Sequence, residues 1–366
     1  MRIALVHPYP WPEVRRGAER YLDDLSGYLA GVGHEVTVVT GTHDRPGRLR
    51  AESGAWIERR RHLRPVPRLG LSEVETFGLA ALGPLAAQPF DVVHAMVPAA
   101  ALAARLGRRP TLYTVLGHPA PDQLPGARVP RALFLQAVRR ATEVATLSAA
   151  SAKGLEAMTG RHSLVLPPGV RTDRFPPALD PRSGPPTVLL PASLDDPRKR
   201  AALAVEAFGR LLRRQPEARL VVSGQGDPTK LLETVGNDVR AAVVATGPGD
   251  PEDVPALYRA ATVTVLPAAH EAFGLVLVES LASGTPVVCT PDGGMPEVVV
   301  PGVGEVAETA TAEALCAALE VAISLAADPE TPRRCAERAR RWDWEHVVGP
   351  AYLEAYRSMC LAARRR

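Results

Sequence analysis

Blocks of apolar and polar residues alternate along the chain in a way that predicts parallel strands with helices between them. Short β-branched runs predict buried strands, and a stripe at helical spacing from Tyr21 to Val32, closed by Gly33, predicts a helix. The predicted strands of the first half are residues 3–6, 36–40, 91–97, 111–115, 144–148 and 163–166. Those of the second half are residues 187–190, 219–223, 241–246, 261–266 and 287–290. The two series predict two doubly wound α/β domains.

A proline-rich segment separates the two series. Seven prolines fall between Pro167 and Pro186, with little periodicity, which is typical of a linker. The length of 366 residues suits two domains of about 150 residues or more each. We therefore expect Rossmann-like domains over residues 1–177 and 178–344, followed by a final helix over residues 345–366.

Composition and charge exclude several classes of protein. A net charge of +3 is too small to argue for nucleic acid as a partner. No apolar run reaches the roughly 18 residues of a membrane-spanning helix, and the first predicted strand begins almost at the first residue, so we expect neither a membrane span nor a signal peptide. The four cysteines show no C-x-x-C spacing, which favours free thiols in a reducing, cytoplasmic setting over structural zinc.

Two glutamates, Glu271 and Glu279, mark the most informative segment. Glu279 lies inside an almost wholly apolar helix that we expect to begin near Gly274 and to end at Gly284. Such a helix is buried, and a buried carboxylate needs hydrogen-bond donors. If no protein cation supplies them, the hydroxyls of a sugar or a ribose can.

The position of this helix adds an anion site. Glu271 follows the predicted strand 261–266, at the carboxyl end where open α/β sheets bind ligands. The amides of Phe273, Gly274 and Leu275 open the helix, where unpaired N–H groups and the helix dipole attract anions. Phosphate-binding amides between two hydroxyl-binding carboxylates suit a sugar nucleotide.

The segment from Tyr258 to Val299, which carries both glutamates, resembles the E-x7-E signature of retaining glycosyltransferases of family 4. The resemblance implies the GT-B fold: two Rossmann-like domains, an interdomain cleft and a C-terminal helix that crosses back to the N-terminal, acceptor-binding domain. It implies transfer of a hexose-type sugar from a nucleotide-diphosphate sugar to a hydroxyl of a glycolipid, polysaccharide or small-molecule glycoside, with retention of the anomeric configuration.

The resemblance also assigns roles to basic residues. Lys199, together with Arg198, would neutralise the diphosphate leaving group, although the family arginine normally lies nearer Ser193. The residues themselves favour the same interpretation. Asp196 and Pro197 predict a helix start, and two cations in a first helical turn oppose the helix dipole unless an anion binds there. A solvated basic helix start is the alternative.

Further site residues are implied with less complete matches. Gly17 lies where the family has a glycine-rich loop near the distal phosphate of the donor, but Arg16 replaces a second glycine. His118 follows the place of a family histidine, which Leu116 occupies here, and it could be a catalytic or a surface residue. The remaining glycines, which would bring the backbone close to the donor, are Gly224 and Gly294.

The expected partners follow from these assignments. Glu279 would bind the ribose and Glu271 the transferred sugar, with no cofactor and no metal, because the sequence holds no D-x-D triplet for a metal-held diphosphate. The acceptor is unknown. Eight arginines between Arg45 and Arg68 could draw the protein to anionic lipid at the inner face of a membrane, but an exposed edge strand and loop explain them as well.

Three other functions compete with sugar transfer. A sugar-nucleotide epimerase can use the same fold, and the departures at Arg16, Leu116 and Ser193 would also fit an inactive nucleotide-sugar-binding protein. A nicotinamide-dependent oxidoreductase would need an early G-x-G-x-x-G, and residues 7–17 contain a single glycine. We therefore favour transfer over all three.

Overall fold

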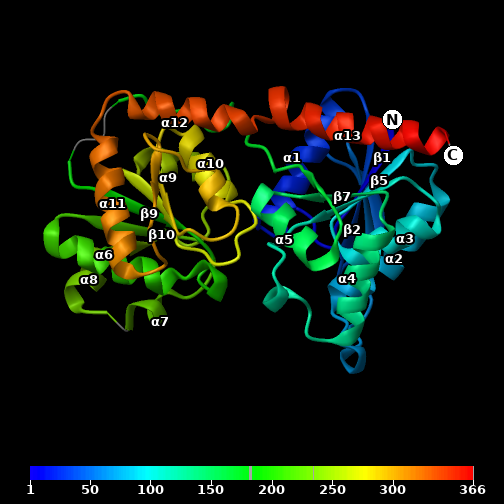
Figure 1. The fold of residues 1–366 in the computed structure, drawn as a ribbon, viewed down its shortest axis with the longest axis horizontal. Coiled ribbons are helices and arrows are strands. Elements are labelled where there is room, and N and C mark those ends of the chain that lie inside the picture. Colours follow the sequence, from blue (N-terminus) through cyan, green and yellow to red (C-terminus); the bar gives the residue numbers. More distant parts are fainter. Residues whose placement is uncertain (181–183, 234, 366) are drawn as a thin grey trace. The chain divides into compact units, whose positions relative to one another are not determined.

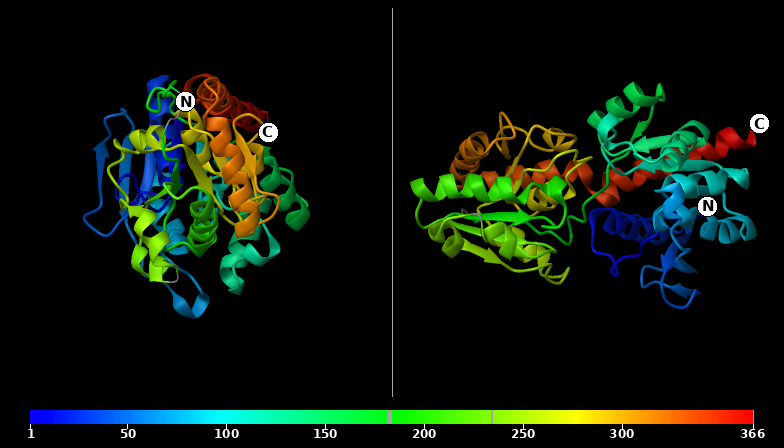
Figure 2. Two further views of the ribbon diagram at one scale, coloured as in Figure 1. Left: turned by 90° about the vertical axis from the view of Figure 1, so that its left-hand side faces the viewer. Right: turned by 90° about the horizontal axis from the view of Figure 1, so that it is seen from below.

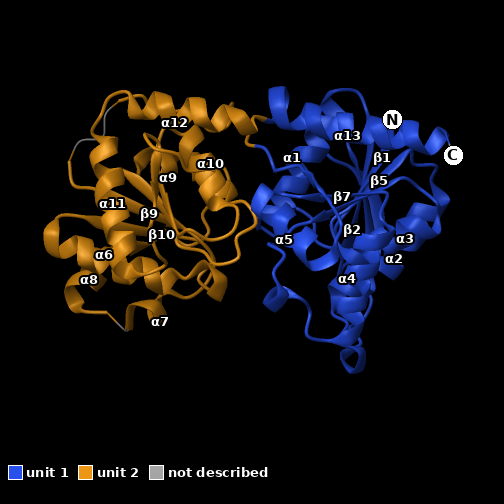
Figure 3. Cartoon of the chain, viewed as in Figure 1, with its two compact units in different colours: residues 1–169, 344–366 blue, residues 170–343 orange. Residues whose placement is uncertain are grey.

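The computed structural model describes residues 1–180, 184–233 and 235–365, so that Pro181 of the proline-rich segment lies outside the described residues. The chain divides into two compact units (Figure 3). Unit 1 comprises residues 1–169 and 344–366, and unit 2 comprises residues 170–343. Each unit is a Rossmann-like layer of parallel strands between helices (Figures 1 and 2), which confirms the predicted fold class.

The sheet of unit 1 has the strand order β3-β4-β2-β1-β5-β6-β7-β8 and is parallel except where β3 meets β4. Its strands are β1 (Arg2–Val6), β2 (Glu35–Thr42), β3 (Gly47–Arg50), β4 (Trp56–Arg61), β5 (Val92–Ala95), β6 (Thr111–Val115), β7 (Glu143–Thr146) and β8 (Leu164–Val165). Each strand predicted for the first half overlaps one of these. Strands β3 and β4 were not among the strands predicted by range, although an edge strand was one explanation of the arginines at 45–68. The two strands carry five of those eight arginines: Arg48, Arg50, Arg59, Arg60 and Arg61.

Helices cover both faces of this sheet. They are α1 (Gly17–Gly31), α2 (Glu73–Ala87), α3 (Pro98–Leu106), α4 (Arg128–Arg140), α5 (Ala149–Thr159) and α13 (Gly349–Arg364), with a π-helical turn at Trp344–Val348 and 3-10 turns at Pro67–Leu69 and Pro121–Gln123. Ala4 and Val6 face the core under α2, α3 and α4. Since side chains alternate along a strand, Ile3 and Leu5 face the opposite side.

The last helix, α13, is fixed to unit 1 by buried polar contacts. The hydroxyl of Tyr21 donates to that of Tyr352 at 2.7 Å, and Tyr352 donates to the carbonyl of Leu166 at 2.7 Å. Tyr356 lies 2.7 Å from Nδ1 of His94, and burial lowers the pKa of His94 to about 3, so that this imidazole is neutral at pH 7. Satisfied buried polar groups of this kind define one packing arrangement, which places the C-terminal helix in unit 1.

The sheet of unit 2 is parallel throughout, with the order β11-β10-β9-β12-β13-β14. Its strands are β9 (Thr187–Pro191), β10 (Arg219–Ser223), β11 (Val243–Ala245), β12 (Val263–Leu266), β13 (Val287–Cys289) and β14 (Gly304–Val306). Its helices are α6 (Ala201–Arg214), α7 (Pro228–Glu233), α8 (Asn237–Ala242), α9 (Val254–Ala260), α10 (Leu275–Ala282), α11 (Ala312–Ala326) and α12 (Thr331–Ala339). The 3-10 turns are Pro197–Lys199, Met295–Glu297 and Arg340–Trp342. Each strand predicted for the second half overlaps an observed strand, but the first two residues of the predicted strand 241–246 belong to α8, and β14 was not predicted.

The boundary between the units lies earlier than the expected residue 177. The amide of Val170 donates to the carbonyl of Trp342 at 2.7 Å, and Val170 pairs with Asp343 as an isolated bridge. These backbone bonds place the proline-rich segment from Val170 onward in unit 2, whereas Pro167 and Pro168 belong to unit 1. Within the described ranges, no helix is long and apolar enough to cross a membrane.

Candidate functional site

Three loops of unit 2 meet at one edge of its sheet. Strands β9, β12 and β13 are neighbours and run parallel, so the loops that follow them lie at the same, carboxyl-terminal edge. The first loop carries Lys199, the second carries Glu271 and the third carries Gly294. Strand adjacency therefore places together residues that are far apart in the sequence.

An ion pair joins the first two loops. Nζ of Lys199 lies 2.5 Å from Oε2 of Glu271, and the two side chains are 23% and 19% exposed. Both side chains are thus mostly covered but still reach water. Because water reaches this ion pair, a charged ligand can replace one of its two partners without a rearrangement of the loops.

Backbone hydrogen bonds hold the loops in this arrangement. The amide of Ala269 donates to the carbonyl of Arg198 at 2.7 Å, and the amide of Gly294 donates to the carbonyl of Glu271 at 2.8 Å. A Cβ on Gly293, whose φ is +63°, would lie 2.0 Å from the same Glu271 carbonyl. The third loop can approach Glu271 this closely only because residue 293 is glycine.

Asp292 and Tyr258 belong to the site, but sequence reasoning did not assign them a role. Asp292 accepts a hydrogen bond from the amide of His270 at 3.1 Å, and it lies 3.7 Å from the guanidinium of Arg200. The place of Asp292, two residues after the predicted strand 287–290, was a usable signal. Tyr258 lies in the segment that carries the family resemblance, but only the packing of α9 against α10 shows its partner.

That partner is Glu279, which is 3% exposed and accepts a hydrogen bond from the Tyr258 hydroxyl at 2.8 Å. The prediction of a buried carboxylate in an apolar helix is confirmed, since residues 277–282 are all buried. The first donor that the structure supplies is a neutral hydroxyl of the protein. A carboxyl group has two oxygens and can accept more than one hydrogen bond, including bonds from ligand hydroxyls.

The start of α10 also agrees with the sequence prediction. Gly274 is the N-cap with φ of +93°, and the first intrahelical bond runs from the amide of Leu277 to the carbonyl of Gly274 at 2.9 Å. The amides of Phe273, Gly274 and Leu275 precede this bond, and the first N–H groups of a helix have no intrahelical acceptor. Gly284, with φ of +81°, follows the C-terminal end.

Arg198 differs from the expectation. Asp196 is an N-cap, as predicted, but it begins a 3-10 turn at Pro197–Lys199, and α6 starts only after Arg200. The guanidinium of Arg198 binds both oxygens of Asp196, at 3.2 and 2.7 Å, and is exposed. The structure therefore brings Lys199, but not the side chain of Arg198, to Glu271.

Gly224 lies in the turn after β10, at the same edge of the sheet. A Cβ there would be 2.1 Å from the carbonyl of Ala192, in the turn after β9, and the amide of Leu194 donates to the carbonyl of Gln225 at 2.7 Å. The backbones of these two turns therefore pack closely, and the expected approach to the donor stays a prediction. These turns adjoin the 3-10 turn that carries Lys199.

Two further predicted residues, Gly17 and His118, belong to unit 1. Gly17 is the first residue of α1, and an added Cβ would meet no atom within 4 Å, so the packing of the chain does not require glycine there. Arg16 pairs with the buried Glu19 and lies over the ring of Tyr9, 5.1 Å from its centroid. His118 is partly buried, with Nδ1 3.2 Å from the hydroxyl of Ser151.

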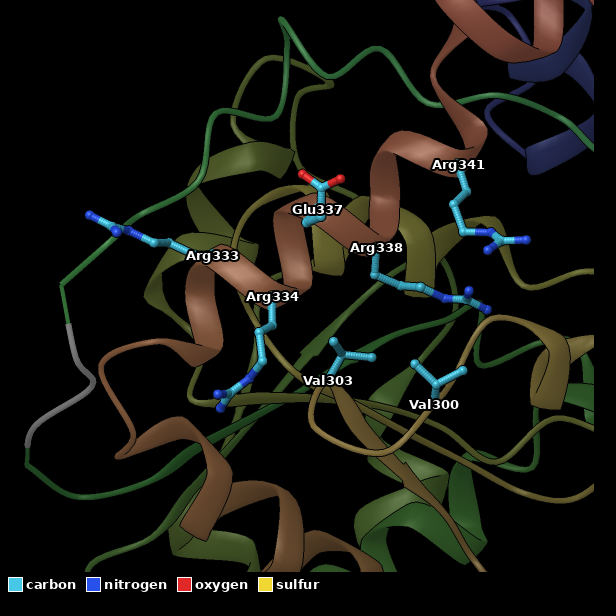
Figure 4. Close-up of a pocket in the computed structure, with 7 residues that line it drawn as sticks. All are labelled: Val300, Val303, Arg333, Arg334, Glu337, Arg338 and Arg341. Atoms are coloured by element: carbon cyan, nitrogen blue, oxygen red, sulfur yellow. The ribbon is translucent and has the colours of Figure 1, made fainter.

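A separate hollow in unit 2 contains none of the predicted residues. Its volume is about 590 Å³, and Figure 4 shows its lining on α12 and on the loop before β14. The lining residues are Val300, Val303, Arg333, Arg334, Glu337, Arg338 and Arg341. Several of these arginines hold the backbone, since Arg334 donates to the carbonyl of Gly302 and Arg338 to that of Val298. We assign the site to the Lys199–Glu271 edge.

A lysine–glutamate pair, a helix start and a buried carboxylate at the edge of a Rossmann-like sheet suit a transferase that uses a nucleotide sugar. The comparisons agree: residues 172–342 match the family model of glycosyl transferases group 1, and residues 15–174 match that of glycosyltransferase family 4. The chain belongs to this glycosyltransferase family. It is an enzyme that transfers a sugar from a nucleotide-diphosphate sugar to a hydroxyl acceptor with retention.

Individual relatives cover the chain almost completely. It is 30% identical to an MMP alpha-(1->4)-mannosyltransferase of Mycolicibacterium hassiacum, over 95% of this chain and 96% of the relative. It is 28% identical to a GDP-mannose-dependent alpha-(1-6)-phosphatidylinositol monomannoside mannosyltransferase of Mycolicibacterium smegmatis, over 91% of each. The structure of a sucrose-phosphate synthase from Thermosynechococcus elongatus aligns with a TM-score of 0.84 at 22% identity, over 99% of both chains, which supports the fold.

Proposed function

We propose that the protein is a mannosyltransferase that uses a nucleotide-diphosphate mannose and needs no metal at the diphosphate. The ion pair of Lys199 with Glu271 carries this proposal. The pair supports the proposal because a cation suits the diphosphate, a carboxylate suits the sugar hydroxyls, and Glu271 shortly precedes the amides at the start of α10. Cation, amides and helix dipole together supply the positive charge that a metal ion would otherwise provide.

In the proposed reaction, the bond between the anomeric carbon and the diphosphate oxygen breaks as the bond to the acceptor oxygen forms on the same face. The transition state resembles an oxocarbenium ion. Lys199 stabilises the charge on the departing diphosphate, one oxygen of which takes the proton of the acceptor hydroxyl. Glu271 holds hydroxyls of the mannose and Glu279 those of the ribose, so both carboxylates position the donor.

The choice of mannose is supported by the two mycobacterial relatives, which are both named as mannosyltransferases, one of them GDP-mannose-dependent. The test is a transfer assay in which the purified enzyme, without added metal, meets GDP-mannose and the UDP-, ADP- and dTDP-sugars. A thermal-shift measurement with each nucleotide reports binding separately, because a ligand of the folded state raises the melting temperature. We expect stabilisation by GDP and GDP-mannose and release of GDP when an acceptor is present.

Other outcomes of the assay would refute parts of the proposal. Transfer from another nucleotide sugar would leave the enzyme class intact and replace mannose. Conversion of GDP-mannose to another sugar without an acceptor would favour the epimerase, and binding without turnover would favour the inactive protein. Activity that disappears with a chelator and returns with Mg²⁺ would contradict the metal-free diphosphate site.

We also propose that the acceptor is presented at an anionic lipid surface. Exposed cations and apolar side chains occur together around the β3–β4 hairpin, and we call this surface the arginine-rich edge. Its residues are Arg45, Arg48, Leu49, Arg50, Leu63, Arg64, Arg68 and Leu69. Basic residues near an anionic membrane contribute about 1 kcal/mol each, and exposed leucines can enter the headgroup region.

Vesicle binding tests this surface. We expect the protein to sediment with vesicles that contain anionic phospholipid, not with neutral ones, and to be released by salt, because the attraction is screened. The double variant Arg64→Ser/Arg68→Ser should bind more weakly. The matched control Arg139→Ser/Arg140→Ser, at the end of α4 in the same unit, should bind like the wild type. Equal binding by both double variants would remove the proposal.

A further inference from the structure

Two histidines and a glutamate of unit 1 lie together at the carboxyl-terminal edge of its sheet. His43 directly follows β2 and His62 directly follows β4, and these strands are parallel with Thr42 opposite Arg61. The rings therefore lie side by side, with centroids 4.6 Å apart. Glu73 is the first residue of α2, and its Oε2 is 3.5 Å from Nε2 of His43.

The geometry of these three side chains suits a metal ion. One ligand atom from each of them lies within 4.8 Å of the other two. Zinc bonds of about 2.0–2.2 Å in a tetrahedron separate the ligand atoms by roughly 3.3 Å, so side-chain rotations would close the site. His43 and Glu73 are 70% and 30% exposed, and each has room for such a rotation.

The surroundings of His62 supply a second, independent observation. Its ring packs against Tyr9 and Phe77, and Gly41 leaves the space that it fills, since a Cβ there would lie 2.2 Å from Cε1 of His62. Nδ1 of His62 is buried and has no hydrogen-bond partner among the residues that the structure describes. A buried polar atom without a partner requires an explanation, and a bound ion is one.

We propose that His43, His62 and Glu73 bind a Zn²⁺ ion. Imidazole and carboxylate ligands suit zinc, whereas Mg²⁺ and Ca²⁺ prefer oxygen ligands. Three protein ligands leave one tetrahedral position for water or for an oxygen of a bound molecule.

This site is independent of the proposed donor chemistry. Its residues lie in unit 1, whereas Lys199 and Glu271 lie in unit 2. The proposal therefore concerns metal binding itself, and it stands or falls without any measurement of sugar transfer.

Zinc binding by the full chain, prepared without a histidine tag and stripped of metal, tests the proposal. Competition with a chromophoric chelator should show one Zn²⁺ per chain. Loss of a residue that merely supports a metal ligand weakens binding about 10–100-fold, so His43→Asn, His62→Asn and Glu73→Gln should each weaken it at least tenfold. Co²⁺ in place of Zn²⁺ should give the strong visible absorption of a four-coordinate site.

The controls separate a built site from a surface histidine. His162, just after α5, lies with its Nδ1 3.1 Å from Oε2 of Glu156 on that helix and so forms a histidine–glutamate pair of the same kind. His162→Asn should therefore bind zinc like the wild type. If His62→Asn unfolds, the exposed His43→Asn variant still decides. Wild-type affinity no higher than that of His43→Asn, or an equal loss in His162→Asn, would overturn the proposal.

Discussion

Replacing Lys199 by alanine is expected to lower kcat about 100- to 1,000-fold, the usual cost of removing one electrostatic contact to a developing anion. The physical reason is that Lys199 is the cation that the structure holds against Glu271, at the helix start where the diphosphate would leave. Steady-state transfer kinetics at saturating donor measure the effect. Glu271→Gln should also lower kcat, because the amide binds sugar hydroxyls but no longer orients Lys199.

Stability measurements separate this loss from unfolding. Both side chains of the pair reach solvent, so Lys199→Ala should cost about 1 kcal/mol of unfolding free energy or less. Lys230→Ala removes an exposed lysine of the same unit and should leave kcat unchanged. Transfer at a near-normal rate by both Lys199→Ala and Glu271→Gln would contradict the proposed roles.

The regular elements of both units could be predicted because parallel strands covered on both faces appear in the sequence as continuous apolar runs. Strands β1, β6 and β12 are of this kind, and each was predicted within two residues of its observed ends. The hairpin of β3 and β4 escaped definition because it lies at the edge of its sheet, where exposed arginines replace the apolar pattern. The hairpin joins the sheet through its backbone hydrogen bonds, and its side chains do not show the pattern of a buried strand.

Single residues of the candidate site could be predicted from the sequence, but the contacts between them could not. The residues Lys199 and Glu271 were found from local patterns, but only the adjacency of β9 and β12 in the sheet makes them an ion pair. Arg198 has the same local pattern as Lys199, yet Asp196, two residues before it, captures its guanidinium. Whether a cation binds a neighbour in the sequence or a distant residue depends on side-chain geometry, which the spacing of residues in the sequence does not determine.

Replacing Glu279 by alanine should affect both donor binding and stability. A hydrogen bond to a charged group contributes about 1.5–3 kcal/mol, so loss of the ribose contact should raise KM for the donor roughly 10- to 150-fold. The same change leaves the hydroxyl of Tyr258, which is 1% exposed, without its acceptor, at a cost of about 1–3 kcal/mol in unfolding free energy. Steady-state kinetics with varied donor and chemical denaturation measure the two effects independently.

Tyr258→Phe distinguishes a binding role of Glu279 from a structural one. It removes the hydroxyl that donates to Glu279 and keeps the carboxylate, so the ribose still finds its acceptor. We expect the phenylalanine variant to lose stability with little change in KM, whereas Glu279→Ala raises KM strongly. If both variants lost the same stability and neither changed KM, Glu279 would be a buried structural partner of Tyr258. The donor would then be held by Lys199, Glu271 and the start of α10 alone.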